Sequence, residues 1–361
     1  MEQIRLIKEM RAADEERGKT GASVRPRFMV WENVPGAFSS NKGLDFGAVL
    51  QETLRVVKPK APAVPMPNSG WPMAGCLFGT GDWSVAWRVL DAQFWGVPQR
   101  RRRIALVADF GGERAPEVLF EREGVSWGYP SCGTKKQATA GGIAESVDRT
   151  KPNALICASG FDGYNSCQTG DVSSTLGVNC GMSTGRNGVF EPVYALQGNG
   201  IDFADTATFN GKGWREGQSY TLNTIDRPAI GYDEATQKGD GKAPQHYRVR
   251  RLTPLECERL QGYPDEWTNI GAWTDSKGKR HAECTDTERY RALGNSIAIP
   301  PWTYILQRLS LCCETDKTMA SLFDGIGGFP LIWERLNGRG ACLWASEIGD
   351  FPIAVTKKHF A

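Results

Sequence analysis

A glycine-rich turn near the end of the chain separates a short apolar run from an amphipathic stretch typical of a helix. The segment reads Ser-Leu-Phe-Asp-Gly-Ile-Gly-Gly over residues 321–328, and Glu347 follows Gly327 by twenty residues, at the end of the next apolar run. Glycines at a strand-to-helix turn let the backbone approach a ligand, and an acidic residue on the next strand can bind ribose hydroxyls. The feature predicts a nucleotide-type site on an α/β sheet; a tight turn without a ligand is the competing interpretation.

Short apolar runs of the buried-strand type recur along the chain and alternate with helical patterns. Residues 28–31 and 104–110 are such runs, and residues 1–17 and 44–57 have the spacing of amphipathic helices. This alternation predicts an α/β layer architecture with a mainly parallel sheet. Between residues 130 and 245 the sequence becomes rich in Gly, Ser, Thr and Asn, which indicates a separate, loop-rich module that contains β-structure.

Composition excludes several classes of protein. No apolar run approaches the ~18 residues of a membrane span, and the N-terminus is amphipathic and unlike a signal peptide, so we expect a soluble intracellular protein. The ten cysteines are scattered without a Cys-x-x-Cys pair, and there are only three histidines. We therefore expect no disulfide framework, no metal site and no histidine-based catalysis.

Three further motifs carry polar side chains beside apolar runs. Glu32 lies in Trp-Glu-Asn-Val-Pro-Gly at the end of a strand-type run, where a carboxylate can serve in acid/base chemistry or simply cap a turn. Four consecutive arginines, 100–103, run directly into the apolar segment 104–107, so that Arg101 and Arg103 share one side of an extended chain. A basic surface patch is the alternative there. Gly-Asn-Ser at 294–296 precedes an apolar stretch and, by itself, is typical of a helix cap.

Taken together, these segments resemble the DNA cytosine-5 methyltransferases. Phe-Asp-Gly-Ile-Gly-Gly with Glu347 is similar to the S-adenosylmethionine signature, Trp-Glu-Asn-Val-Pro-Gly to the catalytic glutamate motif, and the arginine segment to the Gln-x-Arg-x-Arg motif. The segments Arg-Arg-Leu-Thr-Pro-Leu-Glu-Cys-Glu-Arg-Leu-Gln-Gly-Tyr-Pro-Asp-Glu-Trp and Ala-Leu-Gly-Asn-Ser-Ile-Ala-Ile-Pro-Pro-Trp resemble the two motifs that follow the target recognition domain. The resemblance covers most of residues 1–130 and 246–361.

The resemblance implies a role for each matching residue. Glu32 would hydrogen-bond N3 and the amine of a flipped cytosine, and Arg101 and Arg103 would orient the base and its backbone. S-adenosyl-L-methionine would bind with its adenine bordered by Phe323 and Ile348 and its ribose on Glu347. Its methionine part would be lined by the remaining residues of the turn and of the Gly-Asn-Ser motif, namely Asp324, Gly325, Gly327, Gly328, Asn295 and Ser296.

Two departures from the family pattern stand out. The cofactor signature follows the last motif, which implies a circularly permuted order. The chain also contains no Pro-Cys pair, the setting of the family's nucleophile, and Cys76 and Cys132 are weak substitutes. The family's third and fourth strands and its cysteine loop are missing, so the chain is interpreted as a split or truncated enzyme, to which a partner polypeptide with the Pro-Cys motif would restore activity.

The expected fold is thus an α/β, Rossmann-like S-adenosylmethionine-dependent methyltransferase sheet, permuted and lacking two strands, with a small loop-rich target recognition domain. Residues 1–129 form the first part of the catalytic domain, 130–245 the target recognition domain, and 246–311 the return to the catalytic domain. Residues 312–318 form a linker, and 319–361 form the cofactor-binding part.

The expected function is methyl transfer to C5 of cytosine in duplex DNA, in the cytoplasm of a bacterium or from a phage gene, within a restriction-modification setting. The alternatives are a non-catalytic DNA- and cofactor-binding subunit, an RNA methyltransferase, and a dehydrogenase, which the missing third glycine of a dinucleotide motif disfavours. Base contacts would come from the insert, where the candidates are Arg186, Gln197, Asn199 and Arg215.

Overall fold

A computed structural model describes residues 2–120, 247–313 and 317–360 and, between 120 and 247, short strands and Ser219. The helices are α1 (Glu2–Glu16), α2 (Leu44–Leu54), α3 (Ala115–Leu119), α6 (Pro254–Gln261), α7 (Asp286–Asn295), α8 (Ile299–Cys312), α9 (Gly328–Asn337) and α10 (Asp350–Phe360). Short 3-10 turns accompany them at Gly21–Ser23, Pro35–Phe38, Ser40–Gly43 and Ala92–Phe94. None of the described helices is both long and apolar enough to cross a bilayer.

The first part of the chain forms a four-stranded sheet. Its strands are β1 (Phe28–Asn33), β2 (Ala74–Phe78), β3 (Ser84–Asp91) and β4 (Arg102–Asp109), in the order β1-β4-β3-β2. All neighbours are antiparallel, so the expectation of a mainly parallel sheet is wrong for this part of the fold. The loops that join β2 to β3 and β3 to β4 contain no crossover helix, and a parallel pairing needs one.

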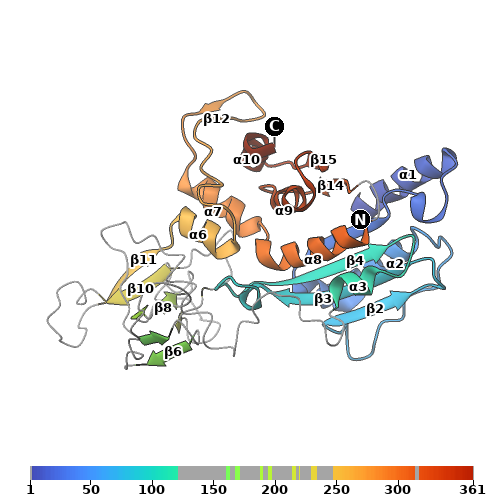
Figure 1. The fold of residues 1–361 in the computed structure, drawn as a ribbon, viewed down its shortest axis with the longest axis horizontal. Helices are drawn as coiled ribbons and strands as arrows, with labels where there is room; N and C mark the ends of the chain where they lie inside the picture. Colours follow the sequence, from blue (N-terminus) through green and yellow to red (C-terminus); the bar gives the residue numbers. More distant parts are fainter. Residues whose placement is uncertain are drawn as a thin grey trace, which may run out of the picture.

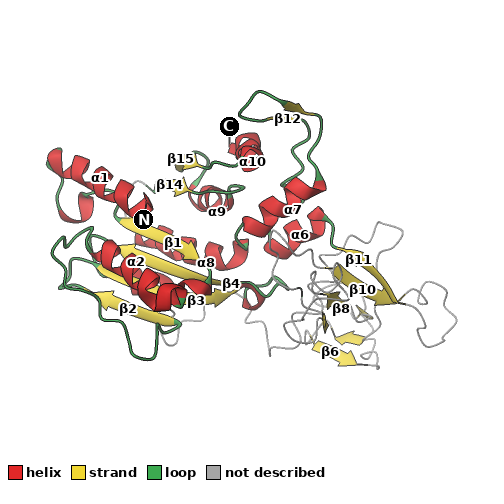
Figure 2. Cartoon of the chain, turned by 180° about the vertical axis from the view of Figure 1, so that it is seen from behind, coloured by secondary structure: helices red, strands yellow, loops and turns green. Residues whose placement is uncertain are grey.

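The central strand β4 is apolar on both sides because both faces of the sheet are covered. Ile104, Leu106 and Ala108 pack against α1 and α2, whereas Ala105 and Val107 pack in the core that contains α3 and α8. Figures 1 and 2 show α8 on one face of the sheet and α2 on the other. A continuous apolar run is therefore compatible with an antiparallel strand when each face meets a helix.

The last part of the chain packs over α8 on the side away from the sheet (Figure 1). Strands β14 (Met319–Leu322) and β15 (Cys342–Ser346) are parallel and are joined by α9, as expected for a strand–helix–strand unit. Trp333 of α9 is buried and donates from its indole to the carbonyl of Lys317 (3.0 Å). In the described part of the chain, this pair forms a sheet of its own, separate from that of β1.

The insert contains β-structure, as its composition predicts. A three-stranded sheet contains β5 (Gly160–Asp162), β6 (Cys167–Gly170) and β7 (Gly188–Val189), and a four-stranded sheet contains β8 (Tyr194–Leu196), β9 (Trp214–Glu216), β10 (Ala229–Asp233) and β11 (Tyr247–Arg251). A small hairpin, β12 (Trp273–Thr274) and β13 (Arg280–His281), follows α6. The labelled strands β6, β8, β10 and β11 lie beyond one end of the β1–β4 sheet (Figure 1).

Candidate active site

The glycine turn joins β14 to α9, and its three glycines meet different surroundings. A Cβ added to Gly328 would lie 2.5 Å from the hydroxyl of Tyr263, and one on Gly327 would lie 2.6 Å from the ring of Phe360. Gly325 has φ +60°, and a Cβ there would meet nothing within 4 Å. Two glycines therefore permit close packing of the protein on itself, whereas Gly325 faces open space that a ligand can approach.

The carboxylate of Glu347 organises the mouth of this turn. Its Oε2 accepts a hydrogen bond from the amide of Gly325 (2.7 Å), and its Oε1 accepts from the amides of Ile348 (2.7 Å) and Gly349 (2.9 Å). Apolar side chains flank it: Ile348 is 90 % exposed and Phe323 is 68 % exposed, the latter with φ 56°. A positive φ at a non-glycine residue is uncommon and concentrates at functional sites.

Asp324 is buried in the turn with one oxygen unused. Ser321 donates its hydroxyl to Oδ1, while Oδ2 has no hydrogen-bond partner. Burial raises the pKa of Asp324 to about 6, although the hydrogen bond from Ser321 opposes the shift. An unpartnered, buried carboxylate oxygen beside an open glycine is suited to accept a hydrogen bond from a cationic group.

Glu32 and Arg103 form an ion pair on neighbouring strands of the four-stranded sheet. Arg103 Nε lies 2.8 Å from Glu32 Oε1, with the glutamate side chain 27 % exposed and the arginine side chain 16 % exposed. Burial lowers the pKa of Arg103, and the glutamate opposes this shift. The pair leaves Glu32 at the end of β1 with its carboxylate fixed but still open to solvent.

Arg101 connects the same sheet to the end of α7. Its guanidinium is buried and donates from Nη2 to the carbonyl of Gly294 (2.9 Å) and to that of Ser296. Burial lowers the pKa of Arg101 to about 9. The Gly-Asn-Ser motif therefore ends α7 and meets Arg101. Its interpretation as a cap of the next helix is wrong, because α8 begins after Ala298 without a side-chain cap.

An unbroken series of contacts links Glu32 to the glycine turn, and we call it the contact chain. It runs from Glu32 to Arg103 near the start of β4, along the backbone to Arg101, which immediately precedes that strand, and from there to Ser296. The side chain of Ser296 hydrogen-bonds the hydroxyl of Tyr263, and that hydroxyl is the atom that packs on Gly328. Motifs that lie almost 300 residues apart in sequence thus meet in one region of the molecule.

The family model for the C-5 cytosine-specific DNA methylases matches residues 77–310. The chain belongs to this family. The matched segment contains Arg101, Arg103 and the Gly-Asn-Ser motif, and it leaves Glu32 and the glycine turn outside.

Phage and bacterial methyltransferases are similar over most of the chain. A protein of Escherichia phage P1 named DNA N-6-adenine-methyltransferase is 29% identical, over 85% of this chain and 48% of its own length. The orphan methyltransferase M.SPBetaI of Bacillus phage SPbeta is 32% identical, over 79% of this chain and 66% of its own. The chain thus spans about half the length of the phage P1 relative. The crystal structure of S. pombe Dnmt2 methyltransferase matches with a TM-score of 0.35 at 13% identity, over 79% of this chain and 64% of that one.

The remaining site residues that the sequence predicts lie in several other parts of the chain. Asn295 is exposed at the last position of α7. Cys76 lies on β2, at the opposite edge of the sheet from β1, and three strand spacings of about 4.8 Å separate these two strands by roughly 14 Å. Arg215 lies in β9, whereas Cys132, Arg186, Gln197 and Asn199 lie outside the described residues. No group of three His, Cys, Asp or Glu that could hold a metal occurs among the residues the model describes.

Two residues of the site were not singled out from the sequence of this methylase. Tyr263 and Trp267 follow α6, and the indole of Trp267 donates to the carbonyl of Ile326 within the glycine turn (2.8 Å). His359 of α10 stacks on Trp267 with ring centroids 3.6 Å apart. The segment Gly-Tyr-Pro-Asp-Glu-Trp was recognised only as part of a motif, because nothing in its spacing tells which side chains reach a turn 60 residues later.

Proposed function

We propose that the chain is the larger part of an S-adenosylmethionine-dependent DNA methyltransferase that acts on C5 of cytosine in duplex DNA. The contact chain carries this proposal, because it brings the Glu32–Arg103 pair and the glycine turn into one region. A base held at Glu32 and a methyl donor held at the turn would therefore share a site. Membership of the C-5 cytosine-specific methylase family supports the same conclusion.

The residues of the turn fit S-adenosylmethionine. Gly325 leaves room for close approach, Glu347 offers a carboxylate to ribose hydroxyls, and the exposed side chains of Phe323 and Ile348 can flank an adenine ring. The unpartnered Oδ2 of Asp324 can accept from the ammonium of the methionine part. When bound, the cofactor supplies a methyl group on a positively charged sulfur, which makes that methyl electrophilic.

In this proposal, the chain's own residues bind and polarise the base. Arg103 holds Glu32 Oε1, so that the orientation of the carboxyl group is already set when it meets a cytosine, where it accepts a hydrogen bond from the amine and supplies a proton to N3. Because Glu32 lies at a strand end, the base must leave the DNA stack to reach it. Arg101 does not contact the base in this proposal; it holds the end of α7 against the sheet by its hydrogen bond to Gly294.

The proposal and its alternative differ in which polypeptide supplies the nucleophilic cysteine. C5 of cytosine becomes nucleophilic when a thiolate adds to C6, and Cys76 lies at the far edge of the sheet from Glu32. The alternative is a DNA- and cofactor-binding subunit to which a second polypeptide supplies the cysteine in a Pro-Cys motif. A circularly permuted order, as the sequence predicts, would suit such a division, and so does the separate β14–β15 sheet.

Covalent trapping on DNA distinguishes an enzyme with its own nucleophile from a subunit that needs a second polypeptide. The chain is incubated with S-adenosylmethionine and duplex DNA that contains 5-fluorocytosine, and the mixture is denatured and separated by electrophoresis. A covalent adduct formed by the chain alone means that it carries its own nucleophile. An adduct formed only after addition of a strand–Pro-Cys–helix polypeptide, and located on that polypeptide, supports the subunit alternative.

The methylated base is identified separately, because the phage P1 relative is named for adenine N6. DNA treated with labelled S-adenosylmethionine is digested, and its nucleosides are analysed by mass spectrometry. The proposal requires 5-methyldeoxycytidine, whereas N6-methyldeoxyadenosine would overturn it. Calorimetry with S-adenosylhomocysteine against NAD removes the dehydrogenase alternative, and DNA against RNA as substrate removes the RNA methyltransferase.

The same proposal assigns the remaining parts of the chain. The insert, predicted over residues 130–245, would read the DNA target, and 312–318 would join the permuted cofactor part to α8. We propose that the protein works on phage or bacterial DNA in the cytoplasm, within a restriction-modification setting. The phage and bacterial origin of relatives named as an orphan and as a putative type II methyltransferase supports the first part of this proposal.

A further inference from the structure

Gln99 carries a fully buried side-chain amide that makes no hydrogen bond. Its exposed fraction is 0 %, and both Oε1 and Nε2 lack partners. A primary amide has two donor hydrogens and an acceptor oxygen, and leaving them buried and unpaired destabilises the state that contains them. Such a group in a folded protein calls for an explanation beyond packing.

The backbone on either side of Gln99 is bonded to a described residue of the insert. Ser219 of the insert bridges to Gln99 through the backbone: the Ser219 amide donates to the carbonyl of Pro98 (2.9 Å), and the Arg100 amide donates to the carbonyl of Ser219 (3.3 Å). Ser219 is itself buried. We call these two hydrogen bonds the Ser219 bridge. The unpaired amide of Gln99 therefore opposes the stability that these two hydrogen bonds give to the bridged state.

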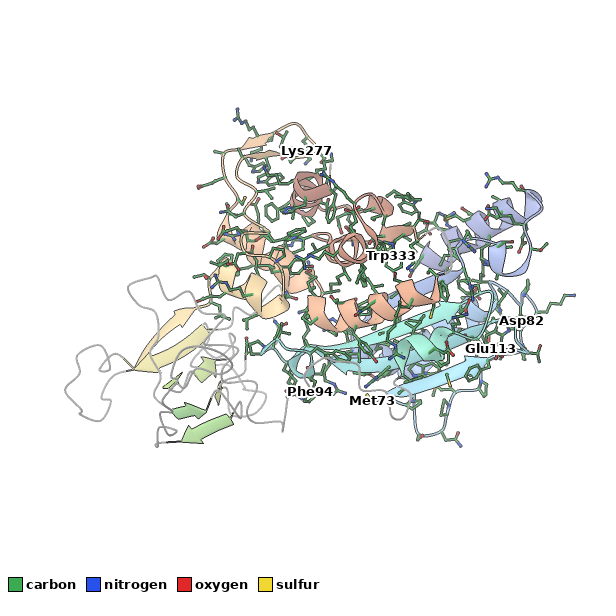
Figure 3. All side chains as sticks on the ribbon, viewed as in Figure 1. Met73, Asp82, Phe94, Glu113, Lys277 and Trp333 are labelled. Atoms are coloured by element: carbon green, nitrogen blue, oxygen red, sulfur yellow. The ribbon has the colours of Figure 1, made fainter. Side chains whose placement is uncertain are left out.

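The loop that contains Gln99 presents side chains suited to a nucleic acid backbone. Arg100 follows it in the sequence and is exposed, and Phe94 is 52 % exposed earlier in the same loop. Phe94 lies at the end of the sheet that faces the insert (Figure 3). In an extended chain, the side chains of Gln99, Arg101 and Arg103 lie on the same side of the backbone. Arg103 is the residue that forms the ion pair with Glu32.

We propose that Gln99 is a DNA-binding residue that the Ser219 bridge keeps covered until DNA is present. Separation of the bridge as the insert engages the duplex turns the amide towards the sugar–phosphate backbone beside the extruded base, and Nε2 donates to a phosphate oxygen. A hydrogen bond to a charged acceptor is stronger than either bond of the bridge, so DNA shifts the balance towards the open state. This inference rests on the proposed DNA substrate.

The test compares Gln99→Leu with the unaltered chain and with Gln93→Leu. Gln93 lies in the same loop, but its amide donates to Asp91 (2.6 Å), so its replacement serves as the control. The probe is sheared bacterial DNA from a strain without DNA methyltransferases, bound in the presence of S-adenosylhomocysteine. Leucine removes the unpaired atoms at similar volume, so the Tm of Gln99→Leu should equal or exceed that of the unaltered chain.

We expect Gln99→Leu to lower DNA affinity about tenfold, the loss of one charge-assisted hydrogen bond, while S-adenosylhomocysteine binding stays unchanged. DNA should also increase hydrogen exchange at the amides of Arg100 and Ser219, which a purely structural role would not do. DNA affinity within about twofold of the unaltered chain, or slower exchange at both amides on DNA binding, overturns the inference. If the unaltered chain binds no DNA, the proposed function fails together with it.

Discussion

Replacement by alanine should have opposite effects at two glycines of the turn, Gly328 and Gly325. At Gly328 the added Cβ would lie 2.5 Å from the hydroxyl of Tyr263 and 2.8 Å from a side-chain carbon of Ile297. Both neighbours are buried and cannot withdraw freely. Overpacking of this kind typically destabilises by about 1–3 kcal/mol, which for a domain of this size lowers Tm by roughly 2–4 °C per kcal/mol.

At Gly325 the same change has a different physical effect. The Cβ meets no protein atom within 4 Å, and only the φ of +60° opposes alanine, by about 1–2 kcal/mol. The methyl group would point into the space proposed for the cofactor. Gly325→Ala should therefore weaken binding of S-adenosylhomocysteine at least about tenfold. Its Tm should fall by no more than corresponds to the cost of about 1–2 kcal/mol for alanine at a positive φ.

A double variant separates overpacking from other effects. Tyr263→Phe removes the hydroxyl that Gly328→Ala would strike, and by itself it also loses the hydrogen bond to Ser296. In the Tyr263→Phe background, Gly328→Ala should therefore lower Tm by about half as much as it does in the unaltered chain, since the contact with Ile297 persists. Tm is measured by differential scanning fluorimetry, and binding by calorimetry. Normal ligand affinity in Gly325→Ala, or an unchanged Tm in Gly328→Ala, would refute the assignment of one glycine to the ligand and the other to packing.

Three further outcomes follow from the contacts of the site. Glu32→Gln should reduce the rate of methyl transfer at least about 100-fold and leave the affinity for S-adenosylhomocysteine unchanged. The rate is measured with labelled cofactor, in whichever polypeptide composition is active. An equal loss of rate and of cofactor affinity would contradict the assignment of Glu32 to the base. Arg101→Met should lower Tm, because the carbonyls of Gly294 and Ser296 lose a buried donor, at about 1–3 kcal/mol each. Asp324 has a pKa raised to about 6, so the folded state holds the proton of this carboxyl group more tightly than the unfolded chain does. The contribution of Asp324 to the free energy of unfolding is therefore fully present below about pH 4, and ~3 kcal/mol is lost as the pH rises to 6. Asp324→Asn should abolish that dependence in urea titrations across this range, and a slope equal to that of the unaltered chain would contradict it.

The local elements were predictable from sequence because their determinants are local. The apolar run before the glycine turn, the helix after it and the strand that ends at Glu347 occur as expected. The helix α6 has the same kind of local determinant, because Thr253 and Glu256 form a capping box at its start. Such signals depend on residues three or four positions apart, which the sequence displays directly.

Long-range features were harder to predict. The apolar composition of β4 suggested a parallel strand, but a strand between two helical layers has the same composition whatever its direction. The roles of Tyr263 and Trp267 depend on contacts across about 60 residues of chain. The Ser219 bridge, which joins Gln99 to a residue 120 positions away, has no counterpart in any sequence pattern.

A crystal structure of the chain with S-adenosylhomocysteine tests the central claim most directly. The account predicts a ligand whose ribose lies on Glu347 and whose homocysteine lies over Gly325, with its sulfur facing the same opening as the carboxylate of Glu32. A ligand bound elsewhere, or one whose sulfur faces away from Glu32, would contradict it.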